Sequence, residues 1–86
     1  MNKFHKKVLD NINIPVERIS FRKDKWGEIA TVYYGKATKP TTIGDDHDKD
    51  EWESFLETVK QGSRSFVTEA KKVYGNNWKD FVKHRS

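Results

Sequence analysis

The 86-residue sequence has no cysteine, only two leucines and no apolar run approaching the length of a membrane span. The absence of cysteine excludes disulfides, thiolate metal sites and cysteine nucleophiles. A transmembrane helix needs about 20 predominantly apolar residues, so we expect no span in this chain. Lysines near the N-terminus are not followed by an apolar run, so we also expect no signal peptide and a cytoplasmic protein.

Motifs of common catalytic sites are missing as well. The five glycines stand singly, so none of them builds a glycine-rich phosphate loop. His5, His47 and His84 are far apart in the sequence, and no serine lies in a glycine-flanked nucleophile elbow. A chain of this length has room for one small core and little room for a substrate pocket. We therefore expect residues 1–86 to form a single non-catalytic domain without a cofactor.

Apolar periodicity in the first half predicts one helix followed by strands. A one-sided apolar stripe predicts a helix over residues 2–11, which ends before Pro15. Residues 16–23 alternate between two faces, and residues 28–34 are rich in β-branched and aromatic side chains. A short polar loop with a glycine joins them, which is typical of an antiparallel hairpin. A third strand near residues 41–43 is left open by the sequence.

The second half has the pattern of amphipathic helices. Asp48 and Glu51 have the spacing of a capping box, and an apolar stripe with helical spacing follows them. Gly62 is expected to break the helix, although it would also be compatible with a bend in one long helix. Gly75 is placed to end the next helix, and a short helix follows. The predicted class is α+β, with an N-terminal helix, a hairpin or small three-stranded antiparallel sheet, and two to three C-terminal helices packed on one face.

The net charge of +4 conceals three blocks of alternating sign. Residues 1–44 have a net charge of +5, residues 45–57 a net charge of −6, and residues 58–86 a net charge of +5. Basic blocks favour nucleic acid as a partner, whereas the acidic block would repel it. The sequence thus indicates that any nucleic acid contacts one face of the molecule and avoids another.

The first functional hypothesis is a small nucleic-acid-binding accessory protein, of the kind encoded by phages or mobile elements. Arg18 and Arg22 share one face of the first strand, and the second strand contributes either Tyr33 or Tyr34 to that face. Arginine beside an aromatic ring suits phosphate contact and base stacking, and Trp26 at the hairpin tip adds a second ring. The basic C-terminus would extend this surface. The predicted nucleic-acid-binding residues are Arg18, Arg22, Lys25, Trp26, Tyr33, Lys71, Lys72, Lys83 and Arg85.

The alternative hypothesis is a protein-binding modulator, acting as a monomer or homodimer on a host enzyme or transcription factor. It would bind through the acidic segment and exposed aromatic rings. Positions 46–57 also carry oxygen-bearing residues at several of the spacings of a calcium loop, but Glu51 stands where that loop requires glycine. The apolar stripe there favours a helix start, so no metal is predicted. The predicted protein-binding residues are Asp45, Asp46, Asp48, Asp50, Trp52 and Glu53.

Overall fold

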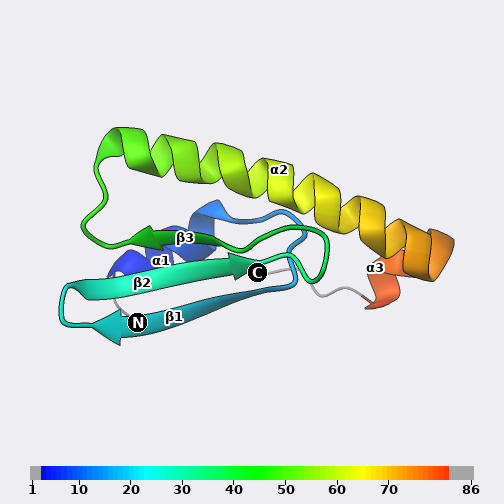
Figure 1. Cartoon of the computed structure of the whole chain (residues 1–86), viewed down its shortest axis with the longest axis horizontal. Coiled ribbons are helices and arrows are strands. Elements are labelled where there is room, and N and C mark those ends of the chain that lie inside the picture. The colour runs from blue at the N-terminus through cyan, green and yellow to red at the C-terminus, as the bar shows by residue number, and fades with distance from the viewer. Residues whose placement is uncertain (1–2, 82–86) are drawn as a thin grey trace.

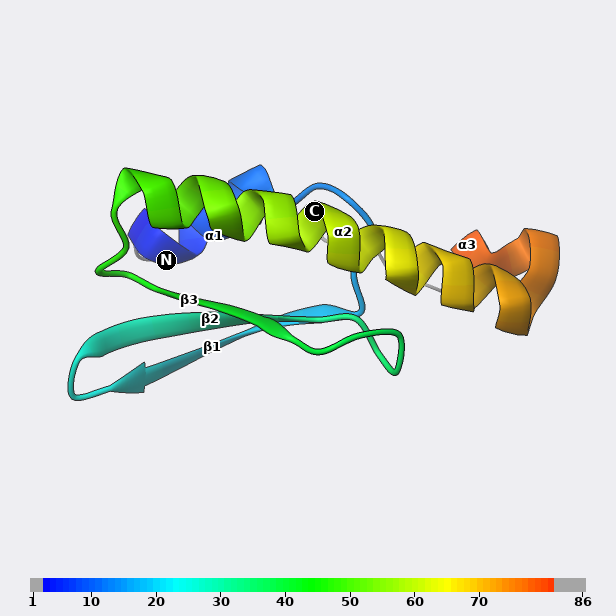
Figure 2. The same ribbon diagram turned by 45° about the horizontal axis from the view of Figure 1, so that its top comes forward.

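The computed structural model describes residues 3–81, which form a helical layer on one face of an antiparallel sheet (Figures 1 and 2). The helical layer consists of α1 (Lys3–Asn11) and α2 (Lys49–Tyr74). The sheet consists of β1 (Arg18–Asp24), β2 (Gly27–Tyr33) and β3 (Thr41–Gly44), in the order β1-β2-β3. A 3-10 turn (Gly75–Asn77) and a short helix α3 (Trp78–Phe81) complete the described chain. The predicted α+β class and N-terminal helix are confirmed, and the third strand, which the sequence left open, is present.

Figure 2 shows α1 and α2 on the same side of the sheet, and no described helix on the opposite side. The described helices include none with the length and apolar character of a membrane span. The hairpin between β1 and β2 turns at Lys25 and Trp26, because Asp24 pairs with Gly27. Gly27 has a φ of +128°, a conformation that glycine adopts without steric cost.

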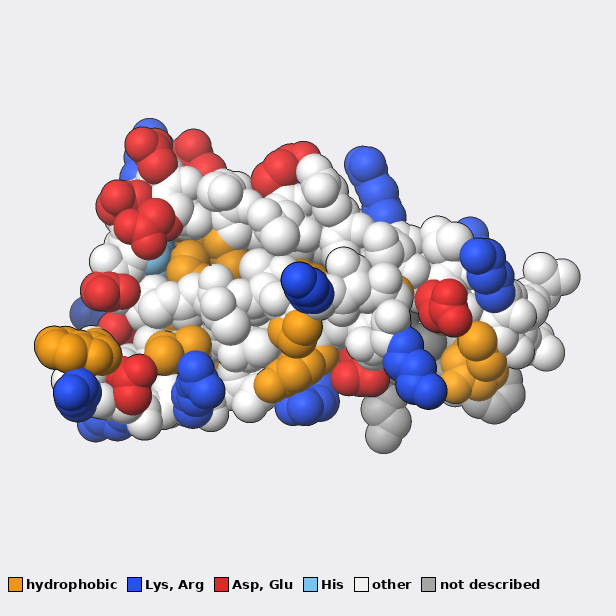
Figure 3. Space-filling model, in the orientation of Figure 1, with side chains coloured by type: hydrophobic (Ala, Val, Ile, Leu, Met, Phe, Trp, Pro, Cys, Tyr) orange, Lys and Arg blue, Asp and Glu red, His pale blue; other side chains and the backbone are white. Residues whose placement is uncertain are grey.

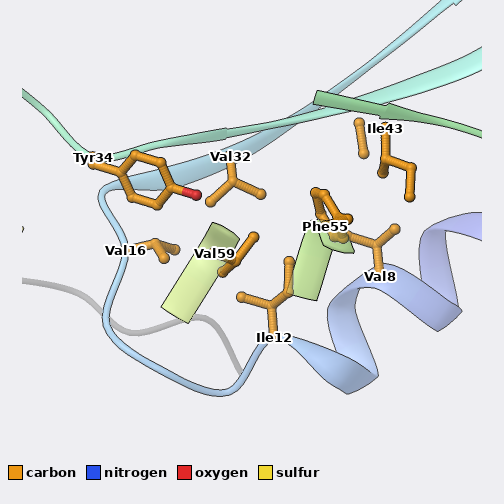
Figure 4. Packing of buried hydrophobic residues seen from close by; sticks show 9 residues of the cluster. Val8, Ile12, Val16, Val32, Tyr34, Ile43, Phe55 and Val59 are labelled. Carbon is orange, nitrogen blue, oxygen red and sulfur yellow. The ribbon is translucent and has the colours of Figure 1, made fainter. Parts of the chain in front are cut away.

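The core lies between the two layers and is built largely from β-branched aliphatic side chains (Figure 4). Phenylalanine contributes less than its abundance suggests: Phe55 is buried, whereas Phe4, Phe21 and Phe66 are only partly buried at the margin. A sequence with two leucines thus fills its interior mainly with valine and isoleucine from α1, the α1–β1 connection, β2, β3 and α2, whereas β1 contributes only partly buried side chains. The buried cluster consists of Val8, Ile12, Val16, Ala30, Val32, Tyr34, Ile43, Phe55 and Val59.

The helix α2 continues through Gly62, so the predicted break at that glycine is wrong. Gly62 is buried, and a Cβ built on it would lie 2.3 Å from Cζ of Tyr34. The absent side chain therefore makes room for an aromatic ring that comes from the end of β2. A long-range contact, and not a local stop signal, explains the glycine. As a result, one 26-residue helix replaces two shorter ones, and only the four-residue α3 follows it.

Tyr34 is 1% exposed, and its hydroxyl donates a 2.8 Å hydrogen bond to Oγ1 of Thr41. Burial raises the pKa of the Tyr34 phenol above its ordinary value, and the hydrogen bond to Thr41 partly offsets that rise. The ring joins β2, the start of β3 and the middle of α2 in one contact. Of the two adjacent tyrosines, Tyr34 is thus a core residue, and Tyr33 is the one that faces outward.

Both predicted ends of the long helix are confirmed. Oδ1 of Asp48 accepts a 2.8 Å hydrogen bond from the backbone N–H of Glu51, which satisfies one of the unpaired donors at the start of α2. Gly75, with a φ of 66°, ends the helix, and its N–H donates to the carbonyl of Lys71. The last third of α2 extends beyond the strands (Figures 1 and 2), where Trp78 packs on Ala70 in a small second cluster.

Candidate nucleic-acid interface

The face of the sheet that lies opposite the helices carries the predicted arginines. In the register of the hairpin, Arg18 pairs with Tyr33, and Arg22 pairs with Ile29. Directly paired residues of antiparallel strands point to the same face, and the core residues Ala30 and Val32 point to the other. Tyr33 is therefore the tyrosine on the arginine face, which we call the outer face. Its residues from the three strands are Arg18, Ser20, Arg22, Ile29, Thr31, Tyr33 and Thr42.

Arg18 and Tyr33 form a stacked pair on the outer face. Cζ of Arg18 lies 3.7 Å from the centre of the Tyr33 ring, within the range of a cation–π contact. Nε of Arg18 also lies 3.8 Å from a carboxylate oxygen of Glu17, a long and exposed ion pair of little energetic weight. The ring thus holds a guanidinium group whose position is defined before any ligand arrives.

The hairpin tip presents a second aromatic ring beside a cation. Trp26 is 76% exposed, the most exposed large hydrophobic side chain among the described residues. Nζ of Lys25 lies 5.0 Å from the Trp26 ring, and the backbone N–H of Trp26 donates a 2.8 Å hydrogen bond to Asp24. With this exposure, the Trp26 ring does not fold back over the core.

The basic residues of the C-terminal half lie elsewhere. Lys71 and Lys72 are exposed in the last turn of α2, on the segment that extends beyond the strands (Figure 1). Nζ of Lys71 is 5.9 Å from the Trp78 ring, and that of Lys79 is 5.8 Å from it. The hairpin tip and these lysines lie at opposite ends of the molecule in Figure 1. The predicted Lys83 and Arg85 lie outside the described residues.

The predicted acidic residues surround the start of α2. Asp45 and Asp46 precede the helix, Asp48 caps it, and Asp50 and Glu53 lie in its first two turns. Acidic side chains gather at this end of α2 in Figure 3. Residues 49–57 are helical, which differs from the coil of a calcium loop. Within residues 3–81, no group of three or more acidic or histidine side chains has a metal-binding arrangement.

Trp52 was predicted as an exposed contact of the acidic surface, but it is half-buried. The ring of His47 stacks on it at a centroid distance of 5.0 Å, and Nζ of Lys7 lies 4.3 Å from its centre. Nζ of Lys7 also donates to Nε2 of His47 at 2.7 Å, and Nδ1 of His47 donates to the carbonyl of Gly44. Trp52 thus fixes the start of α2 to α1 and β3, because its ring takes part in internal contacts.

A second aromatic contact joins α1 to the sheet. The His5 ring of α1 stacks on Phe21 of β1 with 4.0 Å between ring centres, and its Nε2 contacts the carboxylate of Glu28. No local pattern predicted this pairing, since it joins residues from three elements. Its consequence for the interface is indirect: α1 is held on the inner face, and the outer face is left to the arginines.

Scans against known protein families, curated proteins and solved structures find no match to this chain. The outer face and the acidic end are therefore the features of this chain that indicate its function.

Proposed function

We propose that this protein is a non-catalytic nucleic-acid-binding protein that holds single-stranded DNA or RNA on the outer face of its sheet. The arrangement of Arg18 stacked on Tyr33, with Arg22 two pairs farther along the same face, carries the proposal. Guanidinium groups bind phosphates, and aromatic rings stack on unpaired bases. The exposed Trp26 at the hairpin tip continues this surface with a second ring for stacking.

The strands support this function by what they leave exposed. The centre of the outer face consists of small hydroxyl side chains, where Ser20, Thr31 and Thr42 pair across the three strands; Thr42 is exposed, Ser20 is partly exposed and Thr31 is buried. Such side chains are short, so they leave space between the arginines. Their hydroxyl groups can donate hydrogen bonds to phosphate oxygens and can donate to or accept from sugar hydroxyls. The acidic start of α2 repels phosphates, and Asp45 and Asp46 line the same groove as Arg22 and Trp26. This repulsion favours a path for the phosphates that runs from the hairpin along β1 toward Arg18.

Fluorescence anisotropy of a labelled oligonucleotide tests the proposal. We expect binding at about 20 mM salt that weakens strongly by about 200 mM, because phosphate contacts release counterions. The slope of log K against log salt concentration, here called the salt slope, becomes less steep by about 1.4 when two single-strand phosphate contacts are lost. We expect that change for the double variant Arg18→Gln/Arg22→Gln. The matched control is Lys60→Gln/Arg64→Gln, which removes the same charge from exposed positions on α2.

A third variant separates stacking from charge. Trp26→Ala should weaken binding by roughly 5- to 150-fold, the range expected for loss of one stacked base, and should leave the salt slope unchanged. Because Trp26 is so exposed, the same change should leave stability within about 0.5 kcal/mol of the starting protein. Equal weakening by the arginine variant and by its α2 control would show that only net charge matters, and would overturn the outer face as the site.

A second candidate function is protein binding through the acidic end. The observation that favours it is the gathering of exposed carboxylates around the start of α2, next to an open groove that runs along β3. Five of the lining residues of that groove are Asp24, Asp45, Asp46, Asp50 and Glu51. A basic protein segment is the partner whose charge complements this surface.

A further inference from the structure

The strand β3 has a backbone edge that faces away from the rest of the sheet. The strand order places β2 on one side of β3 only. The N–H of Asp45 donates a 2.9 Å bond to the carbonyl of Glu28, which continues the β3–β2 register by one pair. Hydrogen-bonded and non-bonded pairs alternate in antiparallel strands, so Ile43 bonds to β2, whereas the backbone groups of Thr42 and Gly44 point outward.

Among the described residues, only part of that outward edge is hydrogen-bonded. The carbonyl of Gly44 accepts from the backbone N–H of His47 at 3.3 Å and from its Nδ1 at 2.8 Å. Within residues 3–81, no hydrogen bond engages the outward N–H and carbonyl of Thr42 or the N–H of Gly44. Three strand-pairing groups along this edge therefore have no hydrogen-bond partner within residues 3–81.

The sequence protects the two edges of the sheet differently. Four of the seven residues of β1 are charged, which discourages pairing with another strand. The four residues of β3, Thr41 to Gly44, include no charge and no proline. An uncharged edge is the kind to which an additional strand pairs.

An open groove runs along this uncharged edge. All four residues of β3 line it, and successive turns of α2 form its other wall through Asp50, Ser54 and Thr58, with Phe55 at its base. A smaller hollow continues the groove past Gln61 and Ser65. The distance along α2 from residue 50 to residue 65 is about 22 Å at 1.5 Å per residue, which accommodates roughly six residues of an extended chain.

The charge along the groove is uneven. Carboxylates outnumber the single cation Arg22 in the main groove, which Trp26 also lines at the hairpin. Hydroxyl side chains of β3 and α2 line the middle, and Lys39 lies beside the far end. In Figure 3 hydrophobic side chains show between the acidic group and the strands. An extended chain with cationic side chains at one end complements this distribution.

We propose that an extended, lysine- and arginine-rich segment of a partner protein binds in this groove as a fourth strand paired with β3. This inference rests on the second candidate function and gives that function a partner of defined chemistry. Main-chain hydrogen bonds to Thr42 and Gly44 supply affinity, and the carboxylates at the start of α2 select basic side chains and set the direction of the segment.

The test uses a fluorescein-labelled peptide with its cations at one end, Lys-Arg-Lys-Val-Thr-Val, whose binding is measured by anisotropy. Thr42→Pro removes the outward N–H and adds a ring at the edge, so affinity should fall about tenfold or more. Proline is tolerated on an edge strand where the N–H faces solvent, and Thr42 is exposed, so this variant should fold. Thr42→Val keeps the backbone donor and should bind within about twofold of the starting protein.

Two further arms separate strand pairing from charge attraction. Only every second N–H group of an added strand faces β3. N-methylation of the peptide nitrogens that face β3 should therefore abolish binding, whereas N-methylation of the nitrogens that face away from it should not. Asp50→Asn/Glu51→Gln should weaken binding several-fold, whereas Glu57→Gln/Glu69→Gln on α2 should have little effect.

The outcomes distinguish the inference from the function on which it rests. If Thr42→Pro and both methylated peptides bind normally while the Asp50/Glu51 variant binds weakly, strand addition is wrong and acidic-end protein binding survives. If no peptide binds, or if no variant changes binding, both are wrong. If Thr42→Pro weakens oligonucleotide binding instead of peptide binding, the groove belongs to the nucleic-acid interface and the inference is overturned.

Discussion

Substitution of Gly62 by alanine should destabilise the protein, although the same change in an ordinary helix stabilises it. Removing a glycine from a helix interior gains about 1 kcal/mol. At Gly62, however, the added Cβ would lie 2.3 Å from Cζ of Tyr34 and 2.6 Å from both Cε atoms. Carbon atoms in contact prefer about 3.5–4.0 Å, so the ring or the helix must move by about 1 Å or more.

The Tyr34 ring has little room for that movement. It is 1% exposed, and its hydroxyl is bonded to Thr41. Overpacking of a core costs about 1–3 kcal/mol, and loss of the hydrogen bond adds about 1 kcal/mol. After the gain in helix propensity is subtracted, we expect Gly62→Ala to lower the free energy of unfolding by about 2 kcal/mol. For a domain of this size, that corresponds to a Tm lower by roughly 8–16 °C.

Urea unfolding followed by circular dichroism measures this effect. Gln61→Ala, at the exposed neighbouring position on α2, serves as the control and should change stability by less than about 0.5 kcal/mol. In a Tyr34→Leu background the obstructing ring is gone, so Gly62→Ala should become neutral or stabilising. A Gly62→Ala protein as stable as the starting protein would refute the argument that Tyr34 requires the glycine.

Two further predictions concern the helix cap and the buried phenol. Asp48→Ala should lower the free energy of unfolding by about 1 kcal/mol in urea, because it removes the acceptor for the Glu51 N–H, whereas Asp46→Ala should have little effect. In an alkaline titration followed by tyrosinate absorbance, Tyr34 should ionise at a higher pH than an ordinary tyrosine because burial raises its pKa, and Tyr34→Phe should lack that late step. The pKa of Tyr34 is higher in the folded state than in the unfolded state. Its contribution to stability is therefore complete below the unfolded-state pKa and is lost as pH rises through the folded-state pKa. Tyr34→Phe should accordingly lose less stability than the starting protein when the pH is raised.

The outer face could be predicted from the sequence because strand alternation is a local property. Once Ile19 and Phe21 are assigned to the core, Arg18 and Arg22 must face the other way. The choice between Tyr33 and Tyr34 needed the hairpin register, which the sequence does not determine when the loop length is uncertain. The helix cap at Asp48 was predictable for the same reason as the strand faces, since capping acts over three residues.

The incorrect predictions concern contacts between residues far apart in the sequence. Gly62 resembles a helix stop until Tyr34 is seen to occupy the space beside it. Trp52 resembles an exposed contact until His47 and Lys7 are placed around its ring. The groove beside β3 was missed because its hydroxyl-bearing walls have no distinctive composition. The uncharged run from Thr41 to Gly44 was the one available signal.

The most direct test of nucleic-acid binding by the outer face is a titration of isotopically labelled protein with a short single-stranded oligonucleotide, followed by amide chemical shifts. We predict that the largest changes fall on residues 18–33, with the side-chain N–H of Trp26 among them, and that residues 64–74 change little. Largest changes in the last turns of α2, or no saturable change at low salt, would contradict the proposed function.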